Sequence, residues 1–203
     1  MEQKRRAVAT SSPLSTFQDG VALEVARALS LRPGASMDEL AAAAGVSRAT
    51  LFRRFPSRDA LIGELCTSAV QAFLDAVDRA EPESGDSADA WDRVVDGVAE
   101  LASVFGLLGL QPLSAHLETA LLERASVGED RIRQLLRRGQ RSGHFADDVD
   151  PEWVLTLLTW STVAVADAAR LGRMTLEAAQ RHMRRTLSAA LVAPRTAGDS
   201  APA

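Results

Sequence analysis

The segment from residue 36 to residue 55 limits the possible folds of this chain more than any other part of it. Ser36 is followed three residues later by Glu39, which is the capping-box spacing that starts a helix. Gly45 then ends the helical pattern, and Ser47 is placed to cap a second helix. Two short helices joined by a glycine-containing turn are the core of a helix-turn-helix.

The rest of the chain has the composition of a helical protein. Only 4% of its residues are aromatic, none of them Tyr, and no run shows the alternating β-branched pattern typical of strands. Apolar residues at three- and four-residue spacing predict helices over 15–31, 36–44, 47–55, 57–79, 90–106, 112–125, 129–142, 151–171 and 176–192. We therefore expect an all-α fold of about nine helices, with a three-helix module at the N-terminal end.

Composition also predicts how these helices are organised. Residues 1–13 are polar and basic and are expected to form a flexible arm, and residues 193–203 a disordered tail. Between them, residues 14–60 would form the helix-turn-helix domain and residues 61–192 a larger helical domain.

Charge is distributed unevenly between these domains. The whole chain has a net charge of -4, yet residues 1–60 hold nine basic and six acidic side chains, a net charge of about +3. The N-terminal part is therefore the part suited to meet phosphates. Lys4, Arg5 and Arg6 could follow a minor groove, or serve only as a solubilising tail.

Several other classes of protein are disfavoured. The single Cys66, expected to be a buried small residue, excludes an intrachain disulfide, and the three histidines are too dispersed for a metal site. No nucleophile-elbow, Walker or dinucleotide motif is present, so we expect no catalytic residue, no enzyme and no cofactor. No signal-peptide core and no run of 18 apolar residues is found, which predicts a cytoplasmic protein without a membrane partner.

The helix predicted over 47–55 has two chemically different faces. One apolar stripe is expected to pack inward on the preceding helix; it consists of Leu51, Phe52 and Phe55. The opposite face offers a methyl, a hydroxyl and two guanidinium groups, the chemistry that reads base edges, from Ala49, Thr50, Arg53 and Arg54. Arg48, in the first turn, is placed to reach a phosphate beside the helix N-terminus. A solvated arginine face without a ligand would explain the same residues.

A resemblance favours DNA binding over that alternative. The stretch SMDELAAAAGVSRATLFRRFPSRDAL, residues 36–61, resembles the DNA-binding segment of the TetR family of transcriptional regulators, through its AGVS turn, its TLF helix and its FPSRDAL continuation. The resemblance implies a homodimer in which each subunit has a small DNA-binding module and a larger module that binds an effector and dimerises.

The resemblance also implies a role for individual residues. Ser36 and Ser47 would contact phosphates as helix caps, and Arg54 and Arg58 would hold the DNA backbone. Phe52 stands where the family commonly has Tyr, so a hydroxyl contact to phosphate is lost. The residues implied to face the groove are Arg48, Ala49, Thr50 and Arg53.

The last two helices would form a four-helix interface between subunits, as the resemblance implies. Small residues alternate with bulky ones on one stripe of each helix, which would let a partner helix approach closely. The candidates are Leu157, Ala164, Ala168, Leu171, Leu176, Met183 and Leu187. Packing within the subunit's own core is the alternative for each of them.

An effector pocket is expected among the helices from 61 to 160, and its apolar lining would suit an apolar or aromatic molecule. The candidates are Trp91, Phe105, Leu108, His116, Leu117 and Trp160, with ordinary core packing as the alternative for each.

The sequence therefore predicts a small-molecule-responsive repressor that binds a palindromic double-stranded operator as a dimer. The alternative is a helical small-molecule-binding or scaffold protein that has lost DNA binding. That alternative rests on the hydroxyl missing from Phe52 and on the acidic Asp38 and Glu39 beside the motif.

Overall fold

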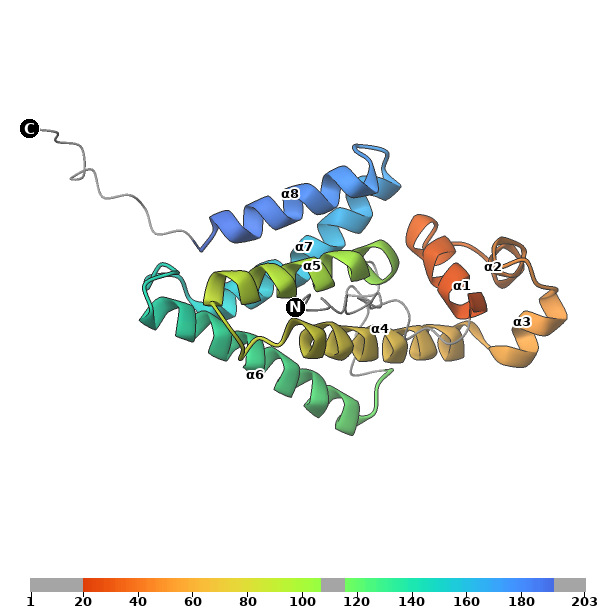
Figure 1. The fold of residues 1–203 in the computed structure, drawn as a ribbon. Helices are drawn as coiled ribbons and strands as arrows, with labels where there is room; N and C mark the ends of the chain where they lie inside the picture. The colour runs from red at the N-terminus through yellow and green to blue at the C-terminus, as the bar shows by residue number, and fades with distance from the viewer. Residues whose placement is uncertain (1–19, 107–115, 192–203) are drawn as a thin grey trace, which may run out of the picture.

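The computed structural model describes residues 20–106 and 116–191, without the side chains of residues 103 and 105. Within these ranges the chain is all-helical and has no strand, which confirms the predicted fold class (Figure 1). The helices are α1 (Gly20–Leu31), α2 (Met37–Ala43), α3 (Arg48–Arg54), α4 (Arg58–Ala80), α5 (Ser87–Phe105), α6 (Thr119–Arg141), α7 (Pro151–Arg170) and α8 (Leu176–Ala189). The expected arm, the C-terminal tail and residues 107–115 lie outside the described residues.

Side-chain caps start most of these helices where the sequence placed them. Each cap accepts a hydrogen bond from a backbone N–H in the first turn, which satisfies a donor that the helix itself leaves unpaired. The predicted caps Ser36 and Ser47 are confirmed in this way, and Ser57, Asp150 and Thr175 cap α4, α7 and α8 by the same kind of hydrogen bond.

One helix prediction is wrong. The segments 112–125 and 129–142 were expected to be separate helices, but residues 119–141 form the single helix α6, which passes through Gly128 without a break. Gly128 is buried, and a Cβ atom there would lie 3.2 Å from the Phe73 ring and 3.1 Å from a Leu74 methyl of α4. The glycine thus lets α6 approach α4 closely, and this packing outweighs its weak helix propensity.

The interior consists of two hydrophobic clusters. The first lies among α1, α2, α3, the first part of α4 and the end of α5; the second lies among α5, α6, α7, α8 and the end of α4. Figure 1 shows α1, α2 and α3 gathered at one end of the molecule, with α4 running from them toward the other helices. Because α4 and α5 contribute to both clusters, the N-terminal module is continuous with the rest of the core.

A buried hydrogen bond reinforces this continuity. The Ser30 hydroxyl, near the end of α1, donates to the Val104 carbonyl near the end of α5 at 2.6 Å. Burial of this pair away from water means that breaking it would leave a polar group unsatisfied, which is costly.

Helix α4 is long and apolar enough to cross a membrane, with a mean hydropathy of 1.4 in its most apolar window. Its apolar side chains, among them Leu61, Leu65 and Val77, are instead buried in the two clusters, as expected for a central core helix. Cys66 lies on the same helix and is fully buried, which confirms its prediction as a packing residue.

Candidate nucleic-acid interface

The first helix of the motif, α2, begins with a complete capping box. The Ser36 hydroxyl accepts from the Glu39 N–H at 3.3 Å, and the Ser36 N–H donates to Glu39 Oε2 at 2.8 Å. This backbone hydrogen bond, with the one from the Ser36 hydroxyl, holds the pKa of the Glu39 carboxyl below its usual range. The start of α2 is therefore fixed by a charged acceptor.

The turn between the two helices depends on Gly45. Its φ of +67° lies in the left-handed region, where a side chain would be strained. Ser47 then caps α3, accepting from the Thr50 N–H at 3.1 Å, and its hydroxyl lies 2.9 Å from the Thr50 hydroxyl. Only residues 44–47 separate α2 from α3.

The inward face of α3 is partly as predicted. Leu51 and Phe55 are fully buried in the first cluster beside Leu40 and Ala41 of α2, which confirms the direction in which α3 packs. The prediction that Phe52 packs inward with them is wrong, because its side chain is only half-buried and does not belong to the cluster. Instead the Arg48 guanidinium lies over the Phe52 ring, 5.0 Å from its centroid.

The outward face of α3 is open. Ala49, Arg53 and Arg54 are exposed and Thr50 is half-buried. Arg53 has no hydrogen bond or ion pair within the described part of the chain. Its guanidinium is therefore available to a ligand outside the protein.

The other three arginines of the motif have partners inside the molecule. Arg48 donates to Asp38 Oδ2 of α2 at 2.6 Å.

Arg54 and Arg58 tie the motif to α4. Both terminal nitrogens of Arg54 donate to the Glu64 carboxylate of α4, and the Arg54 guanidinium also lies 4.9 Å from the Phe55 ring centroid. Arg58, the first residue of α4, donates to the carbonyl oxygens of Ala35 and Pro33 at 2.6 Å each. These contacts were not foreseen from the sequence, which assigned both arginines to the DNA backbone.

The candidate dimer residues on α7 and α8 lie in three different environments. Ala164, Leu171 and Leu176 are exposed, Leu157 and Ala168 are half-buried, and Met183 and Leu187 are buried in the second cluster of this subunit. The sequence did not single out Trp153, which is 59% exposed on α7. The sequence did hold a signal for it, because Trp153 precedes Leu157 by four residues and Trp160 by seven, the spacing of one helix face.

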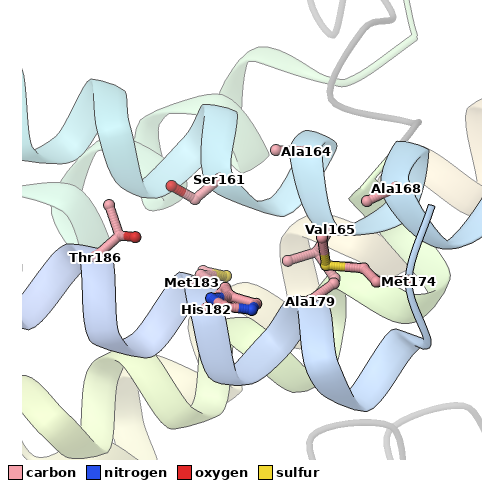
Figure 2. A pocket seen from close by; sticks show the side chains of 9 residues that line it. All are labelled: Ser161, Ala164, Val165, Ala168, Met174, Ala179, His182, Met183 and Thr186. Carbon is pink, nitrogen blue, oxygen red and sulfur yellow. The ribbon is translucent and has the colours of Figure 1, made fainter.

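A hollow of about 270 Å³ lies between α7 and α8. Figure 2 shows side chains from both helices facing it, with Met174 of the connecting turn at one end. Its walls are mainly apolar, and three of the candidate dimer residues contribute to them, Ala164, Ala168 and Met183. The other lining residues are Ser161, Val165, Met174, Ala179, His182 and Thr186.

The candidate effector residues do not form one group. Trp91 and Leu117 are buried, and His116 is half-buried. Trp160 is 56% exposed on the outer face of α7, because Val154, Leu158 and Val165 occupy the inward positions of that helix. Leu108 and the side chain of Phe105 lie outside the described residues.

A capped helix-turn-helix with an open arginine face defines a DNA-binding protein of the helix-turn-helix class. Comparison with known proteins shows which proteins this motif is similar to. The family model for bacterial regulatory proteins of the tetR family matches residues 23–65, which include the whole motif. Over these residues the chain is similar to the TetR family, and this similarity confirms the prediction of a DNA-binding transcriptional regulator.

Individual relatives extend the likeness beyond the motif. The transcriptional repressor LfrR of Mycolicibacterium smegmatis is 27% identical over 164 residues, covering 81% of this chain and 85% of LfrR. The crystal structure of LfrR from Mycobacterium smegmatis in complex with proflavine has a TM-score of 0.66 at 23% identity, covering 89% of this chain and 98% of that one. The crystal structure of PfmR from Thermus thermophilus has a TM-score of 0.62 at 24% identity, covering 86% of this chain and 100% of PfmR.

Proposed function

We propose that this regulator is a small-molecule-responsive repressor in the cytoplasm that binds a palindromic operator as a homodimer. The observation that carries the DNA-binding part is the open face of α3, where Arg53 is exposed and has no partner among the described residues. Residues 14–60 would act as the DNA-binding domain and residues 61–192 as the effector-binding and dimerisation domain.

In this proposal α3 lies in the major groove. Arg53 would fork onto a guanine, Ala49 would meet a thymine methyl, and Thr50 would contact a base edge or a phosphate. Ser36 and Ser47, at the exposed starts of α2 and α3, would lie near phosphates, where the helix N-termini favour negative charge. Phe52 flanks the groove-facing surface and supports Arg48.

Arg58 would contact the DNA backbone with the N–H groups that its two carbonyl contacts leave unused, since a guanidinium has five N–H donors. Arg54, whose two terminal nitrogens donate to the Glu64 carboxylate, would reach a phosphate from beside that contact. We propose that their first role is to fix α4 to the motif, and that phosphate contact is their second.

The exposed face of α7 supports the dimer. Trp153 and Trp160 are each more than half exposed, and with Ala164 and Leu171 they form an apolar stripe along the helix. Large exposed apolar patches mark interaction sites in soluble proteins. In the proposed dimer this stripe and α8 meet their symmetry copies in a four-helix arrangement, which covers the hollow between them.

An apolar or aromatic effector is proposed for the interior of the larger domain. LfrR was crystallised with proflavine, an aromatic molecule. In this chain the buried Trp91 has an indole N–H with no hydrogen-bond partner in the described structure, so a polar atom of an aromatic ligand could accept from it. Leu117 and His116, on the segment leading to α6, are also proposed to contact the effector, whereas Leu108 and the side chain of Phe105 lie outside the described residues.

Genome-wide binding of the tagged protein, followed by footprinting of the strongest site with purified protein, tests this function. We expect protection of two half-sites whose centres are about 34 to 36 Å apart, which corresponds to one helical turn of DNA. No binding to any site at low salt would instead favour a helical small-molecule-binding or scaffold protein. Light scattering of the same sample gives the oligomeric state independently of DNA.

A further inference from the structure

Arg48 is held in one position by two partners on different helices. Its guanidinium donates to Asp38 Oδ2 of α2 at 2.6 Å and lies 5.0 Å from the ring centroid of Phe52, one turn further along α3. Arg48 stands at the first position of α3, the end that enters the major groove in helix-turn-helix proteins. Arg48 is therefore oriented by the protein itself before any ligand binds.

The pair remains open to solvent. The Arg48 side chain is 67% exposed and the Asp38 side chain 55% exposed. An ion pair of this exposure adds little to folding stability, because water competes with it and two side chains must be ordered. The carboxylate also lies in the first turn of α2, where it favours the helix start, but the stability of the ion pair does not account for its contact with Arg48.

The free donors of Arg48 match the acceptors of guanine. One guanidinium nitrogen is engaged by Asp38, and the remaining N–H groups can fork onto guanine O6 and N7. A guanidinium already fixed by a carboxylate and an aromatic ring loses less side-chain entropy when it makes this contact.

The carboxylate also acts against non-specific binding. In the proposed complex Asp38 would place a negative charge near the phosphates, and it neutralises the charge of the arginine with which it is paired. Contact with a phosphate therefore contributes less binding free energy from the paired Arg48 than it would from an unpaired arginine. The geometry thus favours contact with a base edge over contact with the backbone.

We propose that Asp38 is a specificity-determining positioning residue: it holds Arg48 as a reader of one guanine in each half-site and reduces binding to other DNA. The inference rests on the proposed operator binding. It gives Asp38 a function in DNA recognition, although an acidic side chain in this motif would by itself repel DNA.

A double-mutant cycle on the full-length protein tests the inference. Asp38→Ala, Arg48→Ala and the double variant are compared with the wild type by fluorescence anisotropy. The DNA is the footprinted operator, each single-base-pair variant of it, and a scrambled duplex of equal length, at several salt concentrations. Thermal unfolding by circular dichroism verifies that each variant folds.

We expect Asp38→Ala to raise affinity for the scrambled duplex by about three- to tenfold, because Arg48 becomes free to bind phosphates in both subunits. The salt dependence should steepen, by up to about two counterions per dimer. Asp38→Ala and Arg48→Ala should relax base preference at the same base pair of the half-site, and Asp38→Ala should have no further effect on preference once Arg48 is absent.

Glu24→Ala is the matched control, since it removes the same charge from the same module. Glu24 pairs with Arg27 on α1 at 3.3 Å, and both side chains are about half exposed. The Glu24→Ala variant should change the affinity for operator DNA and for scrambled DNA by the same factor. If Asp38→Ala behaves like Glu24→Ala, or keeps the wild-type base preference, this inference fails while the proposed function stands; if the wild type binds no DNA, both fail.

Discussion

Replacing Arg53 by Ala tests whether the open face of α3 reads DNA. The side chain is exposed and has no partner in the described structure, so its removal should change the free energy of unfolding by less than about 0.5 kcal/mol. A lost base contact costs about 1–3 kcal/mol in each subunit, or about 2–6 kcal/mol in a symmetric dimer. We expect operator affinity to fall by roughly 30-fold or more.

Arg58→Ala is the informative comparison, because Arg58 is tied into the fold. Its two hydrogen bonds to the carbonyls of Ala35 and Pro33 link α4 to the turn between α1 and α2. Losing them from a half-buried site should cost about 1–3 kcal/mol of stability, which is roughly 2–4 °C in Tm for each kcal/mol. Binding should weaken alike on all sequences, since no base contact is lost.

Both variants are measured by anisotropy on operator and scrambled duplexes, alongside thermal unfolding. The expected pattern is a loss of base preference without a loss of Tm for Arg53→Ala, and the reverse for Arg58→Ala. The reasoning would be refuted if Arg53→Ala weakened binding to both duplexes by the same factor, or lowered Tm as much as Arg58→Ala.

Three further predictions concern packing, pH and assembly. A Cβ atom at Gly139 would overlap the buried ring of Phe145, so Gly139→Ala should lose about 1–3 kcal/mol in urea unfolding, and an unchanged midpoint would show that the ring moves freely. The pKa values of Glu39 and Asp86 are lowered, mainly because their carboxylates accept backbone N–H groups, from Ser36 and Ala88 respectively. The stability that these two carboxylates contribute is fully present above their ordinary pKa values, near 4, and is lost as the pH falls through their lowered pKa values. Tm should therefore fall below about pH 4, and the fall of Tm with pH should be less steep in Asp86→Ala. Trp160→Glu should convert the dimer to monomer in light scattering and abolish operator binding, whereas Val127→Glu, equally exposed on α6, should leave the dimer intact.

Helix starts could be predicted from the sequence because their signals are local. A cap such as Ser47 or Thr175 bonds to a backbone group only a few residues away, so its effect does not depend on the rest of the fold. The direction of α3 was predictable for a related reason, since Leu51 and Phe55 are bulky and apolar and lie one helical turn apart.

Contacts between helices could not be predicted in the same way. The pairs of Arg48 with Asp38 and of Arg54 with Glu64 each join residues on two different helices, and their formation depends on the angle between those helices. The continuity of α6 through Gly128 likewise depends on packing against α4. Periodicity identified an arginine face but did not distinguish the arginines already bound within the protein from the open Arg53.

The bound arginines bear on how an effector could control DNA binding. Arg54 joins α3 to α4 through Glu64, and Arg58 joins the α1–α2 turn to the first residue of α4. The first cluster packs the same segments together, so the motif is attached to α4 by charged contacts as well as by apolar packing. The far end of α4 lies in the second cluster, where Val77 is buried within the larger domain. In the proposed repressor, an effector that shifts this end by favouring one arrangement by a few kcal/mol would move the motif with α4, and so change the spacing of the two recognition helices.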